Sequence, residues 1–210
     1  MIDPKRLAGY GPVIPVIVLH RIADAVPLAA ALLEGGVKVL EVTLRTPVAL
    51  ACIEAIARTL PEAIVGAGTI RSAADAQSAA AAGSQFAVSP GYTLEVGQAC
   101  AQQGLPLLPG VATASEVMCA MAAGYPLLKF FPAVQAGGLA MLKALAGPFP
   151  DGVFCPTGGI TIETAPQFLA LANVAVCGGS WLTPQDAVDR ADWQHITRLA
   201  RQASQLRRPD

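Results

Sequence analysis

Leu127-Leu128-Lys129-Phe130-Phe131-Pro132 places one lysine inside an otherwise apolar run. An uninterrupted apolar run of this kind is typical of a strand that is buried on both faces. Because burying an unpaired ammonium is costly, a buried lysine tends to lose its proton and become a nucleophile that can form a Schiff base with a carbonyl carbon. The alternative for Lys129 is that it ends its strand and extends its charged head into solvent.

Apolar runs like this one alternate along the whole chain with segments of helical periodicity, most of which end at a glycine, a common helix terminator. We expect strands at Val13–Leu19, Val39–Leu44, Ile64–Thr69, Phe86–Ser89, Pro106–Pro109, Leu127–Phe131, Val153–Thr157 and Val174–Cys177. We expect helices at Ala25–Leu33, Val48–Leu60, Ala73–Ala82, Thr93–Gln103, Ala114–Ala123, Leu139–Ala146, Glu163–Leu171 and Trp193–Leu206.

This alternation predicts an α/β fold, a (β/α)8 TIM barrel with a short N-terminal segment and a C-terminal helix. The units repeat about every 20 to 25 residues, at the low end for such a barrel. The runner-up is a doubly wound open sheet, which would usually have fewer strands and a dinucleotide-binding fingerprint that is missing here. No linker or low-complexity segment interrupts the chain, so we expect a single domain over residues 1–210.

The composition is 53% hydrophobic and 14% charged with a net charge of -1, which indicates extensive burial and no electrostatic footprint for nucleic acid or an anionic membrane.

Met1–Arg6 lacks the apolar segment of a secretory signal, and no uncharged apolar run is long enough to span a membrane. No H-x-x-x-H motif, carboxylate cluster or Walker loop is present, so we expect neither a metal nor a cofactor. Five scattered cysteines predict reduced core thiols in a cytoplasmic protein: Cys52, Cys100, Cys119, Cys155 and Cys177.

In a parallel barrel, polar residues near the C-terminal strand ends are the candidates for chemistry. Glu41, Thr43 and Arg45 are two residues apart and should share the interior face, while the apolar residues between them face the helices. Glu41 would then approach Lys129 across the barrel, either as a general acid/base beside an imine-forming amine or as a structural ion pair. Arg45 could bind a substrate carboxylate with both guanidinium nitrogens, or form an exposed salt bridge.

Two glycine pairs follow the last two expected strands, in Thr157-Gly158-Gly159 and in Gly178-Gly179-Ser180. One such pair is usually only a turn, but loops at these two strand ends of a barrel frequently bind phosphate through closely approaching backbone. Thr69 and Thr113 follow the third and fifth strands, where each could hydrogen-bond a substrate or cap the next helix; we favour capping for Thr113.

Several of these segments together resemble the 2-dehydro-3-deoxy-phosphogluconate aldolases, a family of class I aldolases with members that also cleave 4-hydroxy-2-oxoglutarate. The similarity runs from about Gly11 to Leu199, and its motifs fall in order on successive expected strands. They are Leu40–Thr46, Val65–Thr69, Ser89-Pro90-Gly91, Lys129–Pro132 and Cys155–Ile160.

The resemblance implies a homotrimeric barrel enzyme, a lyase that cleaves a phosphorylated keto sugar acid into pyruvate and glyceraldehyde 3-phosphate. It assigns the Schiff base to Lys129 and proton transfer to Glu41. The substrate-binding residues that it implies are Arg45 and Thr69 for the carboxylate, Pro90 and Phe131 for the pocket wall, and Thr157, Gly158, Gly159, Gly179 and Ser180 around the phosphate.

The chain departs from the family pattern at Val134, where many relatives carry an acidic residue in a loop expected near the distal half of the substrate. Other functions therefore stay open at this point. They are an aldolase for the 6-phosphogalactonate epimer or for unphosphorylated 4-hydroxy-2-oxoglutarate, a phosphate-binding barrel isomerase or synthase without imine chemistry, and a non-catalytic sugar-phosphate sensor.

Overall fold

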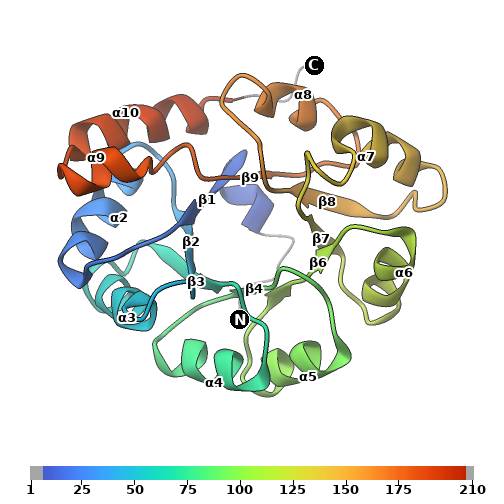
Figure 1. The fold of residues 1–210 in the computed structure, drawn as a ribbon, viewed down its shortest axis with the longest axis horizontal. Coiled ribbons are helices and arrows are strands. Elements are labelled where there is room, and N and C mark those ends of the chain that lie inside the picture. Colours follow the sequence, from blue (N-terminus) through green and yellow to red (C-terminus); the bar gives the residue numbers. More distant parts are fainter. Residues whose placement is uncertain (1–6, 207–210) are drawn as a thin grey trace.

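The structure of the protein, a computed structural model, describes residues 7–206 and shows parallel strands with helices around them (Figure 1). Met1–Arg6, where the sequence lacks a secretory signal, lies outside the described residues. The strands are β1 Val13–Ile17, β2 Val39–Thr43, β3 Ile64–Gly68, β4 Ala87–Val88, β5 Leu107–Leu108, β6 Gly110–Val111, β7 Leu127–Phe130, β8 Val153–Pro156 and β9 Cys177–Gly179.

The helices follow the strands in the predicted alternation. They are α2 Ala25–Glu34, α3 Ala49–Thr59, α4 Ala73–Ala81, α5 Leu94–Gln102, α6 Ala114–Ala122, α7 Gly138–Ala146, α8 Ala165–Leu169, α9 Gln185–Asp189 and α10 Trp193–Ser204, with short 3₁₀ turns at η1 Ala8–Tyr10 and η2 Ile22–Asp24. The predicted helix at Glu163–Leu171 is shortened to α8, and α9 was not predicted from the sequence. Within the described residues, no helix is long and apolar enough to cross a membrane.

The strands form two parallel sheets, ordered β5-β4-β3-β2-β1-β9 and β6-β7-β8. Successive strands are neighbours from β1 to β5, without the reversal of order at the centre of a doubly wound sheet. Isolated parallel bridges from Phe154 to Val174 and from Thr157 to Gly178 connect the end of the second sheet with the region of β9.

Most of the expected strands extend one or two residues beyond the observed strand, and two differ in more than their ends. The expected strand Pro106–Pro109 is shortened to Leu107 and Leu108, which pair with β4, and β6, which was not predicted, follows Pro109 and pairs with β7. The last strand is Cys177–Gly179 instead of Val174–Cys177, because its three residues pair with Val13, Ile14 and Pro15 of β1. The second glycine pair therefore lies inside a strand and not in the loop that follows it.

Alternation along the strands separates the helix-facing core from the interior. Leu40 and Val42 of β2 pack with residues of α2 and α3, and Leu128 and Phe130 of β7 pack with residues of α7. Glu41 and Lys129 each lie between two of these helix-facing residues. Because successive side chains of a strand point to opposite faces, both charged residues face the interior. A third apolar cluster fills that interior below them: Leu7, Ile14, Val39, Ile64, Phe86, Val88, Leu108, Leu127, Cys155 and Val176.

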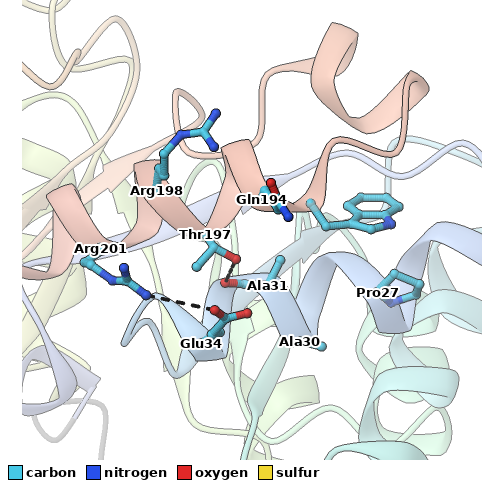
Figure 2. A pocket seen from close by; sticks show the side chains of 9 residues that line it. Pro27, Ala30, Ala31, Glu34, Gln194, Thr197, Arg198 and Arg201 are labelled. Atoms are coloured by element: carbon cyan, nitrogen blue, oxygen red, sulfur yellow. Dashed lines mark hydrogen bonds and ion pairs between the residues drawn. The ribbon is translucent and has the colours of Figure 1, made fainter.

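The terminal helix α10 packs along α2 on the outside of the fold (Figure 2). Thr197 Oγ1 donates a hydrogen bond to the Ala31 carbonyl at 3.1 Å, and Arg201 Nη2 lies 3.9 Å from Glu34 Oε1. A groove of about 570 Å³ lies between the two helices and is lined by their residues alone. The predicted site residues lie elsewhere, at the C-terminal ends of the strands.

Candidate active site

Lys129 of β7 and Glu41 of β2 form a buried ion pair in the interior. Lys129 Nζ donates a hydrogen bond to Glu41 Oε1 at 3.0 Å, and the two side chains are only 4% and 3% exposed. Lys129 therefore does not extend its amine into solvent. The approach of these two residues, which the alternation of both strands predicts, is present in the structure.

Gly68 leaves room for this pair, and a glycine also stands opposite each of its two residues in the strand register. A side chain at Gly68 of β3 would collide with the Glu41 carboxylate, so Glu41 occupies the space that this glycine leaves free. Gly66 stands opposite Glu41 in the register of β2 and β3, and Gly110 of β6 stands opposite Lys129. The charged groups are thus flanked by strand backbone on both sides of the interior.

Cys155 of β8 lies beside the pair, directly opposite Lys129 in the strand register. Burial raises the pKa of the Cys155 thiol to about 12, and the neighbouring Lys129 ammonium opposes this only in part. Cys155 is therefore a protonated thiol at neutral pH. The prediction that all cysteines are core thiols is wrong for Cys119, which is exposed on α6; Cys52, Cys100 and Cys177 are buried like Cys155.

A cavity of about 100 Å³ is bounded by both glycine segments, and neither Lys129 nor Glu41 lines it. Phe131 connects this cavity with the Lys129–Glu41 pair, because its side chain lines the cavity and its ring centroid is 5.4 Å from Lys129 Nζ. Most of the predicted substrate-binding residues line this cavity, together with Gly178 of the predicted second glycine pair and two residues that were not predicted. The predicted residues are Arg45, Phe131, Thr157, Gly158, Gly159, Gly179 and Ser180, and the two others are Val16 and Ile160.

The two glycine segments meet through the bridge between Thr157 and Gly178. Gly158 and Gly159 have φ values of 106° and 75°, in the left-handed region that favours glycine. Such a turn brings backbone groups to the cavity wall without side chains in the way, which is the geometry that anion-binding loops use.

Arg45 and Thr69 contact each other at the rim. Arg45 lies in the turn beyond β2, not within the strand, and its Nε donates a hydrogen bond to Thr69 Oγ1 at 3.3 Å. Thr69 directly follows β3 with a φ of 66° and does not line the cavity. Pro90 is exposed after β4 and also lies outside the lining, with its carbonyl against Gly110.

Thr113 caps α6, as the sequence favoured. Its Oγ1 accepts a hydrogen bond from the Glu116 backbone N–H at 3.3 Å, and Glu116 Oε2 accepts bonds from the N–H groups of Ala112 and Thr113. These backbone bonds hold the pKa of Glu116 below its ordinary value. Thr113 is therefore a helix-capping residue.

Sequence reasoning missed Val16, Ile160 and Trp181. Val16 could have been found from the alternation of β1, since it stands opposite Glu41 in the register with β2. Ile160 directly follows the first glycine pair, and Trp181 follows Gly-Gly-Ser and contacts Gly179. Over residues 7–206 no group of three or more histidine, cysteine, aspartate and glutamate side chains could hold a metal ion.

Comparison with known proteins gives a consistent result along nearly the whole chain. A sequence model of the family described as KDPG and KHG aldolase matches residues 6–199. The chain is 51% identical over 202 residues to a 2-dehydro-3-deoxy-phosphogluconate aldolase of Pseudoalteromonas atlantica, covering 96% of this chain and 94% of the relative. It is 50% identical over 199 residues to the KHG/KDPG aldolase of Escherichia coli K12, covering 95% and 93%.

A crystal structure of KDPG aldolase from Legionella pneumophila superimposes with a TM-score of 0.94 at 47% identity, covering 97% of this chain and 98% of that one. In that crystal, pyruvate is captured at low pH as a covalent carbinolamine intermediate. The chain belongs to the KDPG and KHG aldolase family.

Proposed function

We propose that this protein is a class I aldolase, a lyase that cleaves 2-dehydro-3-deoxy-6-phosphogluconate into pyruvate and glyceraldehyde 3-phosphate. One observation carries the proposal: the chain buries a lysine against a carboxylate, with Nζ and Oε1 3.0 Å apart, and the Phe131 ring, 5.4 Å from that Nζ, lines a cavity bounded by two glycine segments. Relatives about half identical to it carry the names of this activity. The covalent pyruvate adduct of the Legionella pneumophila enzyme is the type of intermediate that a buried amine would form.

Lys129 and Glu41 divide the chemistry between them. With its proton passed to Glu41, the Lys129 amine attacks the C2 ketone to give a carbinolamine. Glu41 then returns the proton to the departing hydroxyl, which leaves as water, and the resulting iminium withdraws electrons from the C3–C4 bond. A base, Glu41 directly or through a water, removes the proton of the C4 hydroxyl as this bond breaks, releasing the aldehyde and leaving an enamine. Protonation at C3 and hydrolysis then free pyruvate and return the amine.

The remaining residues would hold the two ends of the substrate. Arg45 would bind the carboxylate of the pyruvate half, with Thr69 orienting its guanidinium through their hydrogen bond. Phe131 and Pro90 would form the wall beside the reacting carbon. The phosphate would bind at Thr157, Gly158, Gly159, Gly179 and Ser180, which share the lining of one cavity.

The same proposal includes the closure of the two sheets into one (β/α)8 barrel, forming a single domain over residues 1–210. Two facts support it: the interior cluster contains residues from strands of both sheets, and the bridges at Val174 and Gly178 join their ends. We further infer a cytoplasmic homotrimer from the family resemblance. Sedimentation velocity of the purified protein tests the trimer.

The test of the proposed function is imine trapping combined with a coupled assay. Borohydride added with pyruvate should attach the keto acid covalently to Lys129, and a lactate dehydrogenase-coupled assay should detect pyruvate released from the phosphogluconate substrate. Lys129→Ala should lose both signals. A reduced adduct on Lys5, Lys38 or Lys143 would contradict the assignment of Lys129, and pyruvate binding without any trapped adduct would favour a barrel isomerase, a synthase or a sensor.

Cleavage of 4-hydroxy-2-oxoglutarate to pyruvate and glyoxylate is a second candidate activity, favoured by the name of the E. coli relative. Its substrate has the same pyruvate half and lacks a phosphate, so it would use Lys129 and Glu41 without the glycine segments. Comparing kcat/KM for this substrate, the phosphogluconate substrate and its galactonate epimer ranks the three activities. We expect the phosphorylated substrates to be preferred.

A further inference from the structure

Trp181 lies directly against the second glycine segment without lining its cavity. A Cβ built on Gly179 would overlap the six-membered ring of the Trp181 indole, whose nearest atoms are Cζ3, Cε3 and Cη2. Gly179 does not have the positive φ that Gly158 and Gly159 have. Glycine is therefore needed at position 179 for the close approach of the indole and not for an unusual backbone conformation.

Gly178 has the same relation to a different side chain. A Cβ at Gly178 would collide with Thr157, and this glycine also lacks a positive φ. Each glycine of the pair thus has one side chain packed against its backbone, Thr157 on Gly178 and Trp181 on Gly179. The position of this backbone, which forms part of the cavity wall, depends on both contacts.

The indole is held from its other side by the two helix-facing cores. Trp181 packs against the cluster around β1 and β2 and also against the cluster around β7 and β8, and it shares this position with few other side chains. Within the described residues its buried Nε1 makes no hydrogen bond, so packing alone orients the ring. A side chain fixed by both clusters can hold the backbone that it contacts.

We propose that Trp181 is a positioning residue for phosphate recognition: its indole holds Gly179 and Ser180 in the conformation that accepts the phosphate of the substrate, and so favours phosphorylated over unphosphorylated keto acids. This rests on the proposed function, because the phosphate is assigned to the cavity there. The proposed function assigns imine formation with the pyruvate half to Lys129, which does not line this cavity, so Trp181 is not expected to influence it. The effect of Trp181 is therefore confined to one end of the substrate.

Kinetics on paired substrates separate this role from a general structural one. Trp181→Leu should raise KM for 2-dehydro-3-deoxy-6-phosphogluconate by about tenfold or more, because a misplaced binding loop is sufficient for losses of this order. Its kcat/KM for 4-hydroxy-2-oxoglutarate should stay within about twofold of the wild type, well below a loss of that order. Trp181→Phe, which keeps a six-membered ring, should restore most of the affinity. An equal loss on both substrates would mean that Trp181 only supports the fold, and would overturn the proposal.

Borohydride trapping of pyruvate distinguishes the failure of this inference from the failure of the proposed function. Trapping at Lys129 in the wild type and in Trp181→Leu, with unchanged phosphate preference, would refute the role of Trp181 and leave the aldolase proposal intact. Absence of trapping in the wild type would instead refute the aldolase proposal.

Fluorescence gives a readout that does not depend on a variant at Trp181 folding. The chain has two tryptophans, and Trp193 lines the groove between α2 and α10 and not the cavity. In Trp193→Phe, glyceraldehyde 3-phosphate should change the emission of Trp181, and unphosphorylated glyceraldehyde should not. Trp181→Phe is the matched control, in which the remaining Trp193 should not respond. A silent Trp181 at concentrations of the phosphorylated aldehyde that inhibit cleavage would contradict the proposal.

Discussion

The interior and the helical surface of this protein hold ion pairs of two different kinds. Lys129 and Glu41 come from strands far apart in the sequence and are almost fully buried. The pairs Arg58–Glu54 and Arg190–Asp186 lie one turn apart on surface helices, with every side chain more than half exposed. Exposed pairs of this kind contribute little because water and salt screen them.

The buried pair cannot be explained by stability either. Removing two charges from water costs more than their attraction usually returns, so apolar side chains of similar size would serve a core at least as well. The protein nevertheless keeps both charges within the strands and leaves space for one of them at Gly68. The difference between the two regions supports the proposal that the interior charges serve the reaction, whereas the surface charges maintain solubility.

The largest expected effect comes from replacing both interior charges at once. The double variant Lys129→Met with Glu41→Leu should have no cleavage activity, yet it should unfold in urea at the same or a higher concentration than the wild type. Lys129→Met alone should be destabilised by about 3 kcal/mol, because it leaves the Glu41 carboxylate buried without its partner. If the double variant is less stable than Lys129→Met, the buried pair supports the fold. The energetic difference between buried and surface ion pairs on which the comparison rests would then be absent.

A smaller effect is expected from moving the carboxylate without removing it. Gly68→Ala would push a methyl group into the Glu41 carboxylate and should reduce kcat by about 10²-fold, the usual result of a shift near 1 Å at a catalytic group. Gly91→Ala is the matched control: it lies in the loop after β4, and its added methyl group would meet no atom within 4 Å. Equal kcat values for the two variants would show that the position of Glu41 is not critical.

The contrast between interior and surface was predictable from the sequence because a strand has a period of two. Glu41 and Lys129 each stand between apolar residues, and that alone assigns both to the face opposite the helices. The same reasoning could not place Gly178 and Gly179, since glycine is a poor strand former and their strand exists only through pairing with β1. The apolar run Val174–Cys177 looked like the better strand.

The role of Trp181 was not visible in the sequence for a related reason. Its contact with Gly179 depends on how closely the backbone of β9 approaches the turn that follows, and no periodic pattern encodes that distance. Arg45 shows a similar limit, because periodicity assigned it to the interior face as if the strand continued, whereas β2 ends at Thr43 and Arg45 lies in the rim turn. The periodicity of the sequence correctly predicted which face of a strand each residue occupies. The residues at which strands end, and the close approach of Trp181 to Gly179, depend on tertiary contacts that the periodicity does not contain.

The smallest expected effect tests the surface half of the comparison. Arg190→Ala removes one partner of the Arg190–Asp186 pair on α9, where the nitrogen–oxygen distance is 2.9 Å and both side chains are about two-thirds exposed. Despite this short distance, the free energy of unfolding should change by about 0.5 kcal/mol or less, because solvent screens the pair and ordering two long side chains offsets the attraction. Urea denaturation of Arg190→Ala, with Lys129→Met measured beside it, compares one broken pair on the surface with one broken pair in the interior. Losses of similar size would mean that burial does not distinguish the two kinds of ion pair, and the argument for a catalytic role of the interior charges would lose its energetic basis.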